Sequence, residues 1–363
     1  MPIISVSRSL ATFTQLVLLI SFSIQSQASH EHPVDRVLIA TPMKNCEGDL
    51  PSYFQTLLSL DYPKRSIGIA ILESDSTDKT DELLLEFIRI HKSDFMDIVY
   101  TRKPVGYELK TSRRHMREYQ FQRRQVLAQA RNDLLESVNL DHYDYVLWMD
   151  ADAVDFPSTL IQDLVSVGKP VVAPHIVWSK GGMTYDRNSW LETLPQEAWY
   201  SADSVSVMFE GYSSDKPSGH RIYLDDYRRI VGNNKFTTVP LHGVGTAVLL
   251  VNSKVHRAGI NFPIIPYKRR VESEGFGLLA NDNGFEVVGL PNYDIVHNNS
   301  EDWEFPTLAL IMASSLSLCL LSGYSRWKRV FVTKDDEIDY TQQIITDVAI
   351  GSYSTRLVPI NWK

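Results

Sequence analysis

Cysteine is scarce in this sequence, since the 363 residues include only Cys46 and Cys319. Two thiols are too few for the disulfide frameworks that hold small secreted domains together, although one bridge between them stays open. Repeats and low-complexity tracts are lacking as well. The length and the 44% of hydrophobic residues instead predict one large globular domain, with or without extensions, that buries a sizeable core.

An excess of positive charge is also lacking. Lysine and arginine total 36 residues against 44 aspartates and glutamates, which gives a net charge of −8. Proteins that bind nucleic acid along their surface need a basic footprint. The composition therefore excludes a general nucleic-acid-binding protein, and it leaves a nucleotide open as a small ligand.

The N-terminal segment lacks charge between Arg8 and His30, with an apolar centre at residues 16–20. This pattern predicts that residues 1–33 are either a cleavable signal peptide, cut near Ala28 and Ser29, or an uncleaved signal anchor. The uncharged span approaches the roughly 20 residues that cross a bilayer. Either interpretation sends the chain into the secretory pathway, and the glycosylation sequon at residues 298–300 is compatible with that route.

The C-terminal residues 303–363 differ from the rest, because residues 305–325 carry no charge. Three interpretations stay open for this tail: a second membrane segment, a buried helix, or a segment outside the globular fold. We therefore expect the main domain to occupy residues 34–302.

Short apolar runs alternate with segments of helical periodicity through the first half of this domain. Strands are expected at residues 37–40, 67–72, 97–100, 145–148, 170–173, 247–251 and 286–290. Helices are expected over residues 50–60, after Asp78, around residues 126–138 and over residues 158–167. Near-continuous apolar strands in βαβ order predict an α/β fold, a mostly parallel sheet flanked by helices on both faces. The polar residues 180–235 are expected to form a long excursion or lid.

Polar residues follow several of the expected strands. Thr41, Asp75 and Asp150 all fall at the carboxyl ends of strands, where ligands bind in sheets of this kind. Asp75 is interpreted either as a turn residue or as an acceptor of hydrogen bonds from a base or ribose.

The triplet Asp150-Ala151-Asp152 leaves a buried strand with two carboxylates on one side. Such a pair can hold one hard divalent cation, which would bridge a sugar-nucleotide diphosphate and stabilise the departing nucleoside diphosphate. The competing interpretation is a loop whose aspartates cap the next helix. His297 follows a later strand, and a neutral imidazole beside carboxylates favours Mn²⁺ over Mg²⁺.

A basic cluster lies between Lys110 and Arg131. Most of it is expected to form a solvated face. One or two of its arginines remain candidates to clamp a diphosphate through bidentate hydrogen bonds.

Eight motifs occur in an order that resembles a known family. They are Val37–Lys44, Tyr53-Phe54 with Leu60–Pro63, Glu73–Thr80, Ala130–Leu135, Trp148–Asp152, His242–Gly245, Glu274–Gly277, and Gly289–Tyr293 with His297. Over roughly residues 34–300 the chain resembles the fungal mannan-polymerase subunits, which form glycosyltransferase family 62.

The resemblance implies a GT-A fold, a Golgi type II membrane topology with a lumenal catalytic domain, and a hetero-oligomeric mannosyltransferase complex. It also implies GDP-mannose as donor, Mn²⁺ as cofactor, and retaining α-mannosyl transfer to an N-glycan or mannan acceptor.

The resemblance further assigns roles to individual residues. Asp152 and His297 would bind the metal, and Asp150 would belong to the acidic motif at the reacting centre. Thr41, Asp75 and Arg131 would face the nucleotide, together with Asp150. Glu274 would lie by the acceptor or the reacting sugar, and His242 would lie near the donor sugar.

His242 departs from the family pattern, which has aspartate before Gly-Val-Gly. An acidic group is thereby replaced by an imidazole. Two alternatives to an active mannosyltransferase follow: a catalytically weak scaffold subunit of a mannosyltransferase complex, and a GT-A enzyme with another sugar-nucleotide donor.

Overall fold

The computed structural model describes residues 34–298, apart from 110–112, 114–115, 194–219 and 271. The predictions for residues 1–33 and 303–363 lie outside these described residues. Within the described ranges, no helix is both long enough and apolar enough to span a bilayer.

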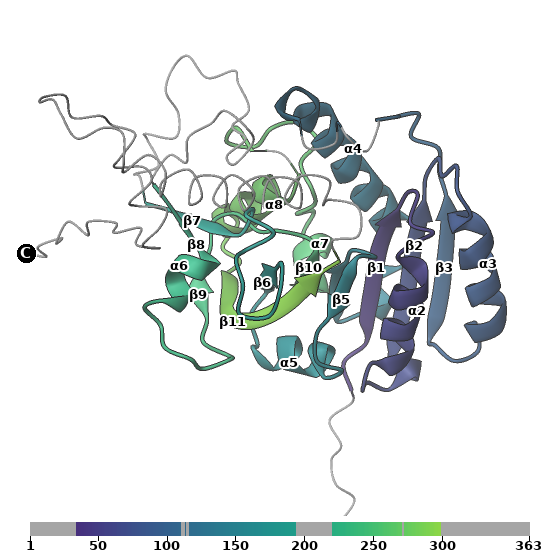
Figure 1. Ribbon diagram of the computed structural model, residues 1–363, viewed down its shortest axis with the longest axis horizontal. Helices are drawn as coiled ribbons and strands as arrows, with labels where there is room; N and C mark the ends of the chain where they lie inside the picture. Colours follow the sequence, from purple (N-terminus) through teal and green to yellow (C-terminus); the bar gives the residue numbers. More distant parts are fainter. Residues whose placement is uncertain (1–33, 110–112, 114–115, 194–219, 271, 299–363) are drawn as a thin grey trace, which may run out of the picture. The chain divides into compact units, whose positions relative to one another are not determined.

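The secondary structure follows the expected alternation of strands and helices (Figure 1). The strands are β1 (Val37–Met43), β2 (Ile67–Glu73), β3 (Asp97–Arg102), β4 (Tyr145–Met149), β5 (Ala153–Asp155), β6 (Val171–Val177), β7 (Trp190–Glu192), β8 (Arg221–Tyr223), β9 (Val239–Pro240), β10 (Val248–Asn252) and β11 (Val287–His297). The helices are α2 (Leu50–Ser59), α3 (Thr80–His91), α4 (Arg117–Glu136), α5 (Leu160–Ser166), α6 (Leu224–Arg228), α7 (Ser253–Arg257) and α8 (Glu272–Asp282). The predicted helix and strand segments are confirmed, with most ends within a few residues, but α4 begins nine residues before the expected helix and β11 ends seven residues after the expected strand.

Nine of these strands form one sheet, in the order β3-β2-β1-β4-β10-β6-β11-β5, with β9 paired to β11. Strands β1, β2, β3, β4, β6 and β11 run in one direction, whereas β5, β9 and β10 run in the other. The predicted fold class, an α/β sheet that is mostly parallel and flanked by helices, is confirmed. The antiparallel direction of β10 was not predicted, because an apolar run in the sequence does not show in which direction the strand runs.

Successive side chains of the central strands point to opposite faces of the sheet and pack into two separate cores. Ile39 and Leu147 pack beneath α2, α3 and α5, whereas Leu38 and Trp148 pack beneath α4, α7 and α8. This two-sided burial explains why the strands are apolar along their whole length rather than at every second position. Figure 1 shows α2 and α3 together on one face of the sheet.

The described part of the expected excursion is packed rather than loose. Strands β7 and β8 form a two-stranded sheet, and Trp190 within it is completely buried. Residues 180–235 thus include a small sheet apart from the main one, as expected of an excursion, and its described part is packed rather than an open polar loop. Trp190 was a stronger signal of burial than the polar residues around it.

Gly68 in β2 lies against the ring of Tyr143. A methyl group at this position would come within 2.3 Å of the Tyr143 hydroxyl, in a place where both residues belong to the core. Only a residue without a side chain therefore fits between β2 and this ring.

We expect Gly68→Ala to lower the free energy of unfolding by about 1–3 kcal/mol, because the added methyl overpacks the core. Urea unfolding followed by circular dichroism measures this difference. Gly48→Ala is the matched control, since a methyl there meets no atom within 4 Å. Equal stabilities of the two variants would contradict the packing argument.

Candidate functional site

The carboxyl ends of the parallel strands meet at one edge of the sheet. Residues Met43 and Glu73 are paired across β1 and β2, and Ala40 is paired with Trp148 across β1 and β4. Asp75 and Asp150 each follow these paired positions by two residues. The register therefore places both aspartates at the same edge, as the sequence predicted.

Strand β10 adds a second set of residues to this edge. It pairs antiparallel with β4, with Val248 opposite Met149, and the backbone N–H of Asp150 donates to the carbonyl of Ala247 at 2.8 Å. Because the two strands run in opposite directions, the residues before β10 lie beside the residues after β4. The Gly-Val-Gly segment and Thr246 are thus brought next to the acidic triplet.

His297 reaches the triplet through the short strand β5. This strand follows the triplet directly and pairs with the end of β11, where His297 lies opposite Ala153. His297 Nε2 is 2.9 Å from Asp152 Oδ2, and the ring of Tyr185 stacks on the imidazole with 3.7 Å between centroids. The structure therefore brings Asp152 and His297, the two predicted metal ligands, into direct contact.

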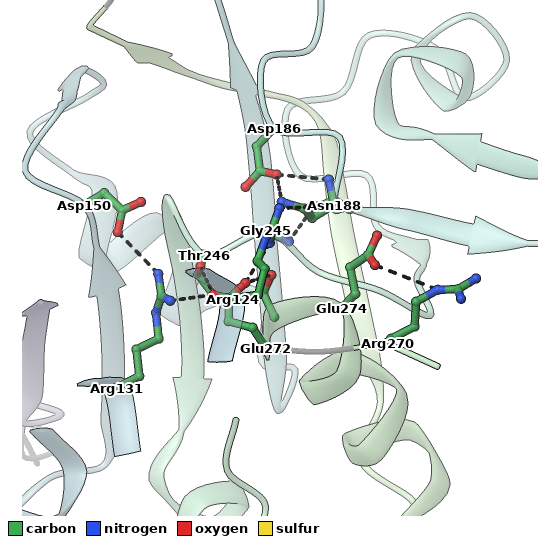
Figure 2. Close-up of polar contacts among 12 residues, drawn as sticks. Arg124, Arg131, Asp150, Asp186, Asn188, Gly245, Thr246, Arg270, Glu272 and Glu274 are labelled. Atoms are coloured by element: carbon green, nitrogen blue, oxygen red, sulfur yellow. Dashed lines mark hydrogen bonds and ion pairs between the residues drawn. The ribbon is translucent and has the colours of Figure 1, made fainter. Parts of the chain in front are cut away.

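The carboxylate of Asp150 contacts Arg131 rather than Asp152 or His297. Its Oδ1 lies 3.6 Å from Arg131 Nη2, and Arg131 Nη1 donates to Glu272 Oε1 at 2.5 Å. Figure 2 shows the Arg131 guanidinium between the side chains of Asp150 and Glu272. Burial raises the pKa of Asp150 to about 7; Arg131 opposes the rise and Asp152 adds to it. A cation placed beside Asp150 would favour its charged form.

The donor set suits a divalent ion only in part. Across the residues that the structure describes, no three His, Cys, Asp or Glu side chains converge on one metal-binding point. The pair of Asp152 and His297 is nevertheless in place, and the buried Oδ1 of Asp152 has no hydrogen-bond partner among the described residues. An anionic oxygen that is buried in this way fits a cation better than it fits a helix cap.

Asp75 shapes the neighbouring loop. Its Oδ2 accepts hydrogen bonds from the backbone N–H groups of Val105 and Gly106, both at 2.8 Å, and these bonds lower the pKa of its carboxyl. Asp75 also adopts a left-handed conformation with φ of 54°, which is uncommon outside glycine. Thr41, by contrast, is buried, and its hydroxyl is paired with the hydroxyl of Tyr53 at 2.7 Å.

Glu274 lies in a separate buried cluster. Its Oε1 accepts from Trp190 Nε1 at 2.8 Å and from Arg221 Nη1 at 3.0 Å, and its Oε2 lies 3.8 Å from Arg270. These contacts position Trp190 and the β7–β8 sheet.

His242 lies beside the same tryptophan. Its Nδ1 accepts from the backbone N–H of Glu192 at 3.0 Å, so the proton of the neutral ring is on Nε2. Burial, and then the charge of Lys268, lower the pKa of His242. The side chain at position 242 is therefore a neutral imidazole.

Sequence reasoning missed several residues that complete this edge. Glu272 lies beneath Asp150, Asn188 accepts from Arg124 at 3.2 Å, and a methyl on Gly245 would come within 1.9 Å of Asp186. Glu272 is two residues from Glu274, the acid that the sequence predicted for this edge. Whether Glu272 or Glu274 lies beside the acidic triplet depends on which arginines each carboxylate contacts. Local sequence contains no signal for that choice.

A second buried contact anchors β4 from behind. Trp148 Nε1 donates to His256 Nε2 at 3.2 Å, and His256 Nδ1 lies 3.0 Å from the carbonyl of Ile260. The imidazole is thus neutral, with its proton on Nδ1, and burial lowers the pKa of His256 to about 4. This neutral ring thus holds Trp148, in the strand that precedes the acidic triplet, by one buried hydrogen bond.

We expect this histidine to make stability depend on pH. Its pKa is about 6.5 in the unfolded chain and about 4 in the fold. The unfolded state therefore binds the proton first as pH falls from 6.5 to 4, and the fold loses up to about 3 kcal/mol over this range.

Urea unfolding at several pH values measures this loss in wild type and in His256→Gln, where the drop should be smaller. His142→Gln, at an exposed position, is the control and should keep the wild-type profile. Parallel profiles for wild type and His256→Gln would show that the histidine does not contribute.

The amino-acid sequence of the chain is similar to those of several known proteins. The chain matches the family described as Anp1 over residues 20–266. It is 32% identical over 282 residues to the mannan polymerase II complex anp1 subunit of Schizosaccharomyces pombe, covering 73% of this chain and 64% of that protein. It is 34% identical over 277 residues to the mannan polymerase complex subunit mnn9 of the same yeast, covering 73% of this chain and 80% of that protein. The chain thus spans just under two thirds of the anp1 subunit.

Solved structures give a more distant similarity. The mannosyltransferase PcManGT from Pyrobaculum calidifontis, in complex with GDP-Man and Mn²⁺, is 14% identical with a TM-score of 0.40, covering 74% of this chain and 58% of that one. At this TM-score the similarity does not bear on function.

Proposed function

The chain belongs to the Anp1 family, and on this premise we propose that it is a metal-dependent retaining glycosyltransferase. The donor we propose is GDP-mannose and the acceptor a mannan or N-glycan chain. The observation that carries the proposal is the contact of Asp152 with His297 at 2.9 Å, beside Asp150 at the carboxyl edge of the sheet. The names of the two yeast relatives, subunits of mannan polymerase complexes, support the choice of mannose.

Asp152 and His297 would hold a divalent ion, with Asp150 beside them. When bound, such an ion supplies positive charge to the diphosphate of the donor. The backbone N–H groups of residues 105 and 106 keep the Asp75 carboxylate charged, so that it can accept hydrogen bonds from a ribose or base.

The remaining task of the protein is positioning. In a retaining transfer the acceptor hydroxyl can lose its proton to the departing phosphate oxygen, so no strong protein base is needed. The edge then acts mainly by orienting the reactants and by stabilising charge. The neutral imidazole of His242 is compatible with this scheme, because it removes neither Asp150 nor Asp152.

We extend the proposal to location and partners. The uncharged N-terminal segment would place the chain at the Golgi membrane with the catalytic domain in the lumen, or would release it for secretion if it is cleaved. The names of the relatives support membership of a hetero-oligomeric mannosyltransferase complex.

A nucleotide titration tests the enzyme proposal. The purified chain is titrated with GDP, UDP, GDP-mannose and UDP-glucose, with and without Mn²⁺, by isothermal calorimetry. We expect GDP and GDP-mannose to bind in the presence of Mn²⁺. Asp152→Ala should weaken that binding by about 10-fold to 100-fold, because it removes a charged group that the metal needs.

Asp155→Ala is the matched control, since Asp155 is exposed and its carboxylate pairs with Lys180 rather than with the residues of the site. It should bind as wild type does. Preference for UDP-glucose would point to another donor. Failure of every nucleotide to bind, with and without Mn²⁺, would overturn the enzyme proposal.

The second candidate is a catalytically weak scaffold subunit. It is favoured by His242, where a neutral ring bound to the β7 backbone replaces the family's acidic group.

Restoring the acid separates the two candidates. For an enzyme, we expect wild type to transfer mannose and His242→Asp to transfer it about 10-fold faster or more, since an added charge near the donor sugar can stabilise the transition state. Mannose transfer to an oligomannose acceptor, followed by mass spectrometry, measures the rates. Transfer by neither protein, with nucleotide binding intact, would favour the scaffold.

A further inference from the structure

The carboxylate of Glu272 is the most heavily contacted acid beneath the site. Its Oε2 accepts from Arg124 Nη1 at 2.7 Å and from Ser273 Oγ at 2.9 Å. Its Oε1 accepts from Arg131 Nη1 at 2.5 Å and from Thr246 Oγ1 at 3.3 Å. The residue is only 1% exposed, so these protein groups replace water around the charge.

The two arginines come from one face of α4. Arg124 and Arg131 are seven residues apart, which is close to two helical turns, and both point toward the start of α8. A single carboxylate therefore accepts from two buried guanidinium groups. Either of them would need another anion if Glu272 were neutral.

Asp150 is the nearest such anion for Arg131. The guanidinium reaches toward both carboxylates, but its distance to Glu272 is 2.5 Å and its distance to Asp150 is 3.6 Å. The second distance is longer than a hydrogen bond. Arg131 is thus hydrogen-bonded to Glu272 and forms a longer ion pair with Asp150 (Figure 2).

The backbone of Glu272 supports the same interpretation. It has a left-handed φ of 54°, which costs free energy in a residue with a side chain, and its N–H donates to Pro263 O at 3.1 Å. A strained conformation at the start of a helix persists only where the surrounding contacts require it. Here the surrounding contacts are the two arginines, Ser273, Thr246 and the carbonyl of Pro263.

We propose that Glu272 is a positioning residue that holds Arg131 away from Asp150, and so keeps the Asp150 carboxylate open toward a ligand of the site. The inference rests on the proposed function for the identity of that ligand, a divalent cation with a diphosphate. Loss of the Glu272 charge turns Arg131 onto Asp150. Asp150 then accepts a direct hydrogen bond from Arg131 in place of the present 3.6 Å ion pair, and the net charge of the site rises by one.

Crystal structures of the metal-free wild type and of Glu272→Gln test the positioning directly. We expect Arg131 Nη2 to close onto Asp150 Oδ1 in the variant, to about 2.8 Å, the length of a charge-assisted hydrogen bond. An Arg131 that stays in its wild-type position would overturn the inference.

Mn²⁺ binding, followed by the electron paramagnetic resonance signal of the free ion, gives the second measurement. We expect Glu272→Gln to weaken the affinity at least about 10-fold. The double variant Glu272→Gln/Arg131→Gln should recover most of the loss, because nothing then captures Asp150. A merely structural role predicts no such recovery, and a missing recovery contradicts the inference.

Two further variants complete the design. Glu272→Gln/Arg124→Gln removes charges of both signs, which protects folding, and leaves Arg131 with Asp150; it should behave as Glu272→Gln does. Asp163→Asn is the control, since Asp163 is a half-buried acid bound to Lys235 and Tyr293 instead, and it should keep the wild-type affinity for Mn²⁺. If wild type binds no Mn²⁺, the proposed function fails, and the position of Arg131 in the crystal structures still decides on Glu272.

Discussion

The antiparallel insertion of β10 between β4 and β6 is the constraint on which the rest of the site depends. It joins the two groups of parallel strands, and its hydrogen bonds fix Ala247 beside Asp150. Because β10 runs against its neighbours, the loop before it reaches the ligand-binding edge instead of the opposite edge. The Gly-Val-Gly segment, Thr246 and the acidic triplet then form one surface, although about 90 residues separate them in the chain.

Charge pairing determines what can be buried beneath that surface. Arg124 and Arg131 on α4 are balanced by Glu272, and Asp150 lies at the outer end of the row. Burial alone would raise the pKa of the Glu272 carboxyl, but the two arginines lower it to about 2. A buried ion pair of this kind adds little net stability, and its value lies in holding side chains in one arrangement. Here the arrangement is that of Arg131 relative to the carboxylate of Asp150, which faces the proposed ligand.

The family assignment and the geometry of the site independently support the proposed metal-dependent glycosyl transfer. Membership of the Anp1 family relates the chain to mannan polymerase subunits, and the contact between Asp152 and His297 is the kind of oxygen and nitrogen donor pair that binds a divalent ion. His242 is a neutral ring that accepts a hydrogen bond from the β7 backbone. In the proposed function it would lie near the donor sugar and would leave the acidic triplet unchanged.

Local sequence patterns determined the strands, the helices and the position of Asp75 and Asp150 at strand ends, because periodic burial and the order of elements are local properties. They also singled out Asp152 and His297. The tertiary structure alone decided the direction of β10, the commitment of Arg131 to Glu272, and the place of Glu274 beside Trp190. These features depend on which charged and apolar partners meet across more than 80 residues of chain. The sequence does not show which carboxylate an arginine will bind. Only the packed fold distinguishes between Glu272 and Glu274, which are two residues apart.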